Sequence, residues 1–361
     1  MAELRVGVAV SDANRADRPH SLRVPEDLPT YARRYREVLG SNEVVLELQP
    51  EERFVVPVGF PDEFRPRPAN RWMRVAERSR DFHHLLTTSR TYLGVHMPVG
   101  GIDTLSSNFF GKYSALEEAR RAMDLADRVG AEYFVVHLAQ RDKWEWARSD
   151  QIAKALKIYK ELAAYYSFHK YTFVPCIEVL EYPKFPATGG ELIYIYNECR
   201  RILPETRIAF NLSHLWRSRN LMLTTGVWGK PDVSFIDHLE YSLSQLWQDI
   251  HVFQLGGCWE TETHCVPGLH PQQNPFQHPM KLHESVGVYD ESGEVNLNAT
   301  LDLLLDYTIE YGRDLNLILE IHDRNLDQIL EAARIIRSDL ADRLEERRHT
   351  SPSDGTGGEV G

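Results

Sequence analysis

The sequence predicts an α/β protein of the (β/α)8 barrel class, and three observations lead to this prediction. The chain has 361 residues, 42% of them hydrophobic, which is enough to bury one large core. Eight short apolar runs recur along the chain, with segments of helical periodicity between them. These runs do not alternate strictly between apolar and polar residues, which is typical of parallel strands covered on both faces.

The eight apolar runs are the predicted strands. In chain order they are LRVGVAV (4–10), EVVLELQ (43–49), TYLGVHM (91–97), EYFVVHL (132–138), TFVPCIEVL (172–180), RIAFNL (207–212), DIHVFQL (249–255) and NLILEI (316–321).

Several predicted helices have recognisable ends. In the helix 114–130, Ser114 and Glu117 have the spacing of a capping box, and Gly130 supplies a stop. The helix 150–166 begins at Asp150, and the helix 325–336 begins at Asn325 with a glutamine three residues later. The remaining predicted helices are 28–39, 70–86, 190–202, 235–247 and 297–311.

Eight strand–helix units match a barrel whose usual size of about 250 residues grows with loop insertions. The longest insertion follows the seventh strand and runs from about Gly256 to Asn296. We expect a single domain over residues 1–345 and a disordered polar tail at 346–361. The alternative is a doubly wound sheet, but no G-x-G-x-x-G motif follows the first strand.

Composition and net charge limit the cellular compartment and the binding partners that we expect for this protein. No apolar run approaches the roughly 20 residues needed to cross a bilayer, and the first residues lack the features of an export signal. The four cysteines show no C-x-x-C pairing, which predicts a reducing compartment and hence a cytoplasmic protein. The net charge of −12 argues against broad binding to nucleic acid, although a local basic patch can override it.

Polar side chains that can bind metals stand at or beyond the ends of most predicted strands. In a (β/α)8 barrel the functional groups stand at the carboxyl ends of the strands. One polar residue in such a place is usually an ordinary loop residue. Imidazoles and carboxylates at most strand ends of one barrel form the ligand set for Zn²⁺, Mn²⁺ or Co²⁺. The side chains are His96, His137, Glu178, Asn211, His214, Gln254, Glu262, His264 and Glu320.

The motifs around these residues occur in an order that resembles the xylose-isomerase-like TIM-barrel superfamily, which holds sugar isomerases, sugar-phosphate epimerases and the endonuclease IV type of apurinic endonuclease. The resemblance covers most of the chain. The motifs that carry it are VHMPVGGIDTLSS, VVHLAQ, IEVLEY, FNLSHL, ETHCVPG and LILEI.

The resemblance implies three groups of metal ligands. One outer group is His96, His137 and Glu178, and the second is His214, Glu262 and His264, with Glu262 in place of the Asp of the family. The central group would be Glu178, Asn211, Gln254 and Glu320. Asn211 and Gln254 stand where the family pattern has Asp and His, and amide oxygens are weaker ligands. We therefore expect a central metal that is weakly held, of the Mg²⁺ or Mn²⁺ kind, or absent. The alternative is that both amides hydrogen-bond each other or a substrate.

The first functional hypothesis is a divalent-metal-dependent isomerase or epimerase of a sugar, sugar phosphate or related hydroxy-carbonyl compound. Glu178 and Glu320 would transfer the proton next to the carbonyl, and His214 would orient a hydroxyl or carry a proton. Trp144, Trp216 and Trp259 would offer aromatic faces to a small sugar-like or polyol substrate, or would merely pack the loops.

Two other hypotheses stay open. The retained outer groups and an arginine-rich stretch after the second strand suit a multi-zinc phosphodiester hydrolase of the endonuclease IV type. The altered central group suits a non-catalytic barrel that binds a small ligand. A homo-oligomer also stays open, because barrels of this kind often pair through their outer helices.

Overall fold

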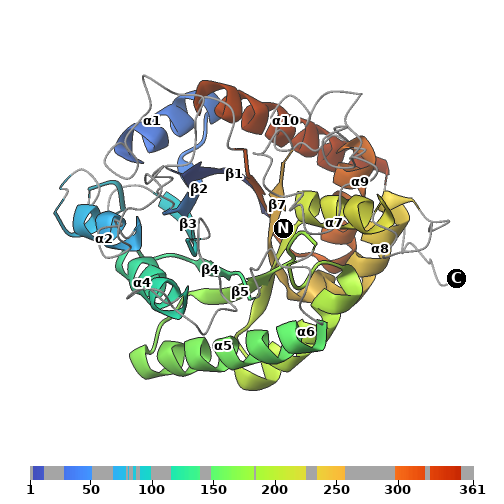
Figure 1. Ribbon diagram of the computed structural model, residues 1–361. Helices are drawn as coiled ribbons and strands as arrows, with labels where there is room; N and C mark the ends of the chain where they lie inside the picture. The colour runs from blue at the N-terminus through green and yellow to red at the C-terminus, as the bar shows by residue number, and fades with distance from the viewer. Residues whose placement is uncertain are drawn as a thin grey trace, which may run out of the picture.

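Eight parallel strands form a closed barrel in sequence order, which confirms the predicted (β/α)8 fold (Figure 1). Each strand pairs with the next, and β8 pairs with β1. This computed structural model describes residues 3–11, 28–50, 68–78, 80, 84–86, 90–98, 115–138, 148–182, 184–224, 234–256, 297–321 and 326–350. The strands are β1 (Leu4–Ser11), β2 (Glu43–Gln49), β3 (Arg90–His96), β4 (Tyr133–Val136), β5 (Val174–Glu178), β6 (Arg207–Asn211), β7 (Ile250–Leu255) and β8 (Leu315–Leu319).

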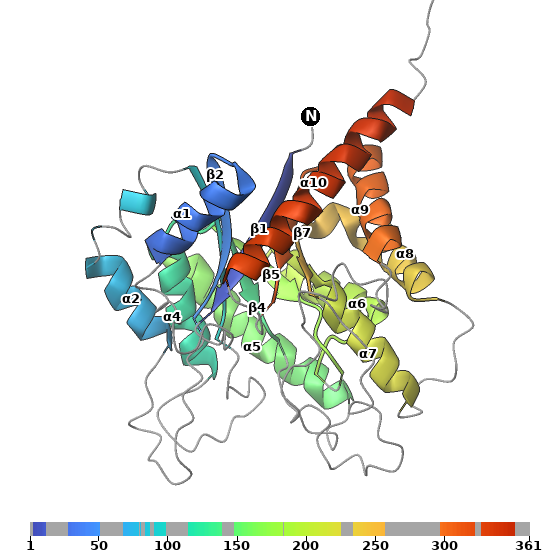
Figure 2. The same cartoon turned by 90° about the horizontal axis from the view of Figure 1, so that it is seen from above.

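Helices surround this barrel and cover the outer face of the strands (Figures 1 and 2). They are α1 (Leu28–Leu39), α2 (Pro68–Arg78), α4 (Ala115–Arg128), α5 (Arg148–His169), α6 (Gly189–Ile202), α7 (Leu212–Thr224), α8 (Phe235–Leu246), the short 3-10 helix η2 (Trp247–Asp249), α9 (Leu297–Tyr311) and α10 (Leu326–Thr350). Among the described residues, no helix is both long and apolar enough to span a membrane.

The largest differences from the predicted elements lie between the sixth and seventh strands and at the last helix. The sequence predicted one helix between the sixth and seventh strands, whereas the structure has both α7 and α8 there. Leu212, predicted as the last residue of a strand, begins α7 instead. The final helix α10 extends to Thr350, beyond the predicted end at 336 and beyond the predicted domain boundary at 345.

Bulky side chains fill the barrel below the ends of the strands. Gly94 on β3 leaves room for the ring of Tyr133 on β4, because a Cβ atom at Gly94 would overlap that ring. The Tyr133 ring centroid lies 6.0 Å from that of Tyr92 and 5.5 Å from that of His251. The hydroxyl of Tyr133 donates a hydrogen bond to Oε2 of Glu47 at 3.0 Å. This aromatic layer supports the polar side chains described next.

Candidate active site

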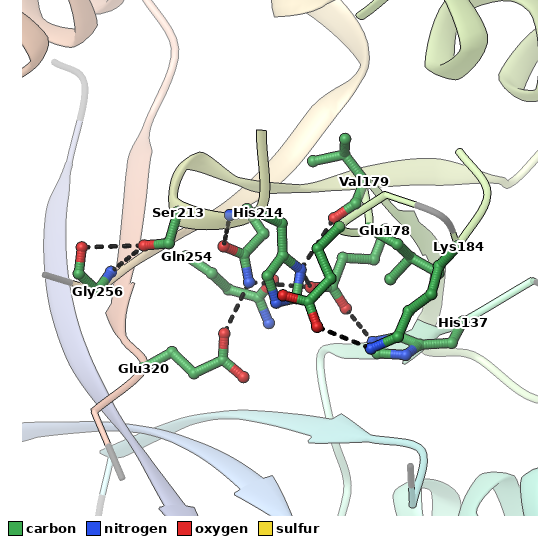
Figure 3. Close-up of polar contacts among 12 residues, drawn as sticks. His137, Glu178, Val179, Lys184, Ser213, His214, Gln254, Gly256 and Glu320 are labelled. Atoms are coloured by element: carbon green, nitrogen blue, oxygen red, sulfur yellow. Dashed lines mark hydrogen bonds and ion pairs between the residues drawn. The ribbon is translucent and has the colours of Figure 1, made fainter. Parts of the chain in front are cut away.

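The structure brings together seven of the nine residues predicted as metal ligands, and all seven are buried. They stand at the carboxyl ends of the strands, except for His214, which lies in the first turn of α7. Figure 3 shows His137, Glu178, His214, Gln254 and Glu320 grouped around one centre. The set is His96, His137, Glu178, Asn211, His214, Gln254 and Glu320.

Glu178 is the centre of this group, and its two oxygens face different partners. Oε2 lies 3.0 Å from Nε2 of His96 and 2.6 Å from Nε2 of His137. Oε1 lies 3.0 Å from Nδ1 of His214 and accepts a hydrogen bond from Nδ2 of Asn211 at 3.0 Å. Burial alone would raise the pKa of Glu178, but the charges and hydrogen bonds of the imidazoles hold it well below its usual range. Glu178 is therefore an ionised carboxylate.

His96 has a defined tautomer. Its Nδ1 lies 2.7 Å from the carbonyl oxygen of Met97, which can only accept a hydrogen bond, so Nδ1 carries a hydrogen. Its Nε2 then meets the carboxylate of Glu178 either as a second N–H or as a lone pair. Burial works to lower the pKa of His96, but the hydrogen bond and charge of Glu178 outweigh it and raise the pKa to about 10. A positive charge is thus favoured between this imidazole and Glu178.

The other two imidazoles are also oriented by acceptors. Burial is the largest influence on His137 and lowers the pKa of this imidazole. The Nδ1 of His214 lies 3.1 Å from the carbonyl oxygen of Val179 and therefore carries its hydrogen. Burial works to lower the pKa of His214, but its contact with Glu178 raises it overall. With its hydrogen on Nδ1, a neutral His214 ring carries its lone pair on Nε2.

Asn211 links two carboxylates and also begins a helix. It directly precedes α7, and its Oδ1 accepts the backbone N–H of His214 at 3.0 Å, as an N-cap does. Its Nδ2 donates to Oε1 of Glu178 at 3.0 Å and to Oε2 of Glu320 at 2.7 Å. The strand therefore passes into a helix at Asn211 without a connecting loop.

A second layer of carboxylate and amide groups continues across the barrel. Nε2 of Gln49 donates to Glu320 and to Glu47, both at 3.0 Å. Nε2 of Gln254 donates to Glu47 at 2.9 Å, while its Oε1 is buried without a hydrogen-bond partner among the described residues. Glu47 is fully buried, and burial raises its pKa.

No role was predicted for Glu47 or Gln49 from the sequence. Both lie on β2, two residues apart, and so point to the same side of the strand. The signal was present as a Glu-x-Gln pair at the end of an otherwise apolar strand.

A buried ion cluster borders the group on the β5 side. Glu181 follows β5, and its carboxylate pairs with Nζ of Lys184 at 3.0 Å and with the guanidinium of Arg217. Burial would raise the pKa of Glu181, but these two cations lower it far below the usual range. The charge of Lys184 also contributes to the lowered pKa of His137.

Of the remaining predicted site residues, the structure describes Trp216. Trp144, Trp259, Glu262 and His264 lie outside the described residues, so the second outer metal group stays a prediction. Trp216 lies in α7, is 4% exposed and belongs to the hydrophobic core. That burial favours a packing role for Trp216 over a platform for a sugar.

Comparison with known proteins shows similarity in structure only. No protein-family model matches the sequence, and no curated protein matches it. A D-tagatose 3-epimerase-like protein has 14% identity and a TM-score of 0.55, covering 95% of this chain and 99% of that one.

Two further solved structures are similar over the same extent. An IolI protein with a bound zinc atom has 12% identity and a TM-score of 0.54, covering 94% of this chain and 98% of that one. Endonuclease IV from Thermus thermophilus has 14% identity and a TM-score of 0.51, covering 94% of this chain and 99% of that one. The chain therefore shares the (β/α)8 barrel fold of these solved structures, at low sequence identity.

Proposed function

We propose that the chain is a divalent-metal-dependent isomerase or epimerase that acts on a sugar or a related hydroxy-carbonyl compound. The observation that carries the proposal is the arrangement around Glu178. Two imidazoles converge on one of its oxygens, and a second buried carboxylate, that of Glu320, lies nearby. Ligand atoms of Glu178, His214 and Glu320 all lie within 4.8 Å of one another. The name of the epimerase-like structure supports this choice of reaction, and the zinc atom in the IolI structure supports a divalent metal.

The residues His96, His137 and Glu178 fit a divalent metal ion. Their ligand atoms lie within 4.8 Å of one another, and all three side chains are buried. His96 donates its Nδ1 hydrogen to a backbone carbonyl, as metal-binding histidines usually do, which directs Nε2 toward Glu178. Two imidazoles and one carboxylate suit Zn²⁺, Mn²⁺ or Co²⁺. When bound, such an ion supplies polarisation of a carbonyl group and stabilises the charge of an enediolate.

Three side chains of the site would take the other roles in the reaction. Glu178 is ionised and lies against two imidazoles, which suits it to hold the metal ion. Glu320 is oriented through both of its oxygens, by Asn211 and by Gln49, and we assign to it the transfer of the proton next to the carbonyl. His214, with its Nδ1 hydrogen committed to Val179 and Glu178, would orient a substrate hydroxyl through Nε2.

The reaction is tested by exchange of substrate hydrogen with solvent. The full chain, purified without chelator and supplied with Zn²⁺, Mn²⁺ or Co²⁺, is incubated in D2O with a panel of ketoses and ketose phosphates. Proton NMR should show loss of the signal from the carbon next to the carbonyl, because the enediolate takes its new hydrogen from solvent. Glu178→Gln and Glu320→Gln should abolish the exchange. Glu240→Gln, on the exposed face of α8, is the matched control and should retain it.

The same preparation distinguishes the two alternatives. Cleavage of an oligonucleotide at an apurinic site, with no exchange on the panel, would favour the hydrolase. A purified chain that takes up none of the three ions and exchanges no hydrogen would favour the non-catalytic barrel. Exchange that survives Glu320→Gln would remove Glu320 from the proposed mechanism.

A further inference from the structure

The side-chain amide of Asn211 stands where the central metal ligand of similar folds would be expected, and its orientation is determined. Oδ1 of Asn211 lies 3.0 Å from the backbone nitrogen of His214. A backbone N–H can only donate, so the atom facing it is the amide oxygen. The NH2 group must then face the opposite way, toward Glu178 and Glu320. An amide NH2 has no lone pair to offer a metal ion.

The hydrogen-bond acceptors on the other side of the Asn211 amide give the same orientation independently. Both groups facing Nδ2 are carboxylate oxygens, at 3.0 Å and 2.7 Å, and an ionised carboxylate only accepts hydrogen bonds. Turning the amide over would remove the cap of α7 and would set its oxygen against two carboxylates. Asn211 therefore cannot become a ligand without losing interactions at both ends of its amide.

Gln254 is the other amide that stands where the family pattern has a metal ligand, and its NH2 group also faces a carboxylate. Gln254 points its NH2 group at Oε1 of Glu47, 2.9 Å away. Gln49 points its NH2 group at both Glu47 and Glu320. The carboxylates of this centre thus receive hydrogens from three amides, and each oxygen of Glu320 accepts one of them.

We infer that the NH2 group of Asn211 takes the place of a central cation, so that no divalent ion binds between Glu178 and Glu320. The inference rests on the proposed function in one respect: the metal of that function would be held by His96, His137 and Glu178 alone. Asn211 and Gln49 are then positioning residues that hold Glu320.

The nearby trio of Glu178, His214 and Glu320 does not offer a second metal site on this reading, although its ligand atoms lie within 4.8 Å of one another. The hydrogens of Asn211 already lie between the two carboxylates.

Metal content of the full chain tests the inference without reference to turnover. Co²⁺ bound per chain is measured by elemental analysis and by titration followed through its visible absorption. Glu320→Gln should leave both the number of ions and their affinity unchanged within about threefold, because Glu320 is not a ligand. Asn211→Asp should bind about one more ion per chain, because its oxygen can still cap α7 while a third carboxylate faces Glu178 and Glu320.

The Asn211→Asp variant without metal brings three carboxylates together and is expected to be less stable. Its melting temperature is therefore measured with and without Co²⁺, and it should rise on adding the ion by more than that of the unsubstituted chain. Loss of an ion in Glu320→Gln would overturn the inference, as would an Asn211→Asp variant that folds and binds no additional ion. The proposed function fails by a different result, namely no ion on the unsubstituted chain or no hydrogen exchange.

Discussion

Protonation of His251 is expected to link the stability of the barrel to pH. This side chain lies on β7 with its Nε2 3.1 Å from the hydroxyl of Tyr92 and its ring against Tyr133. Burial first, and then nearby guanidinium groups led by Arg313, lower its pKa from 6.5 to about 4. The folded state therefore disfavours the imidazolium, whereas the unfolded chain accepts the proton at its ordinary pKa.

The size of the effect follows from the difference between the two pKa values. Because the folded-state pKa is the lower one, the contribution is fully present above about pH 6.5 and is lost as pH falls toward 4. One pKa unit corresponds to about 1.4 kcal/mol, so the whole loss is about 3 kcal/mol. About 2 kcal/mol of it should be lost by pH 5.

The measurement compares the unsubstituted chain with His251→Gln, which keeps an acceptor for Tyr92. The free energy of unfolding is determined by denaturant titration at pH 7.5 and at pH 5, with the m-value checked for constancy. The unsubstituted chain should lose about 2 kcal/mol more than the variant over this interval. Other titrating groups are common to both proteins and cancel. Equal losses in the two proteins would refute the reasoning.

Three further predictions concern packing and buried hydrogen bonds. Gly94→Ala should cost about 3 kcal/mol of unfolding free energy, because its Cβ displaces the ring of Tyr133. Gly189→Ala should separate α6 from α8 by pushing on the hydroxyl of Ser242, and the double variant with Ser242→Ala should regain part of the lost melting temperature. Ser213→Ala should cost about 2 kcal/mol and speed amide hydrogen exchange after β7, because it leaves the backbone of Gly256 without two buried hydrogen bonds.

Each of these has a result that would contradict it. Gly94→Ala with unchanged stability would mean that the Tyr133 ring moves aside at no cost. An equal melting temperature for the single and double variants at Gly189 would show that Ser242 is not the obstacle. Unaltered exchange in Ser213→Ala would show that other groups hold Gly256.

The fold was predictable because its strands are unusually clear in the sequence. Each is a short apolar run, and register and closure follow once eight such runs alternate with helices. The helix α7 was missed because no loop separates it from β6. Asn211 is its only start signal, and the residue three places on is His214 rather than the Glu or Gln of a capping box.

The sequence was sufficient to predict which residues lie at the site, but not which hydrogen bonds they form with one another. Placing His96, Glu178 and Glu320 at strand ends requires only the strand boundaries. The direction of the amide of Asn211 depends on which of its two groups meets the backbone of α7, and that requires the structure. The role of Gln49 was not predicted because its hydrogen-bond partner, Glu320, is 271 positions away in the sequence. A contact between residues so far apart leaves no pattern in the local sequence.

That distance has a consequence for how the protein reaches its native state. The hydrogen bond from Gln49 to Glu320 joins the second strand to the residue after the last one. Contacts this remote along the chain carry a large loop-closure entropy, which slows their formation. We therefore expect the candidate site to be complete only when the barrel has closed, so that a small molecule that binds there would bind only the closed barrel.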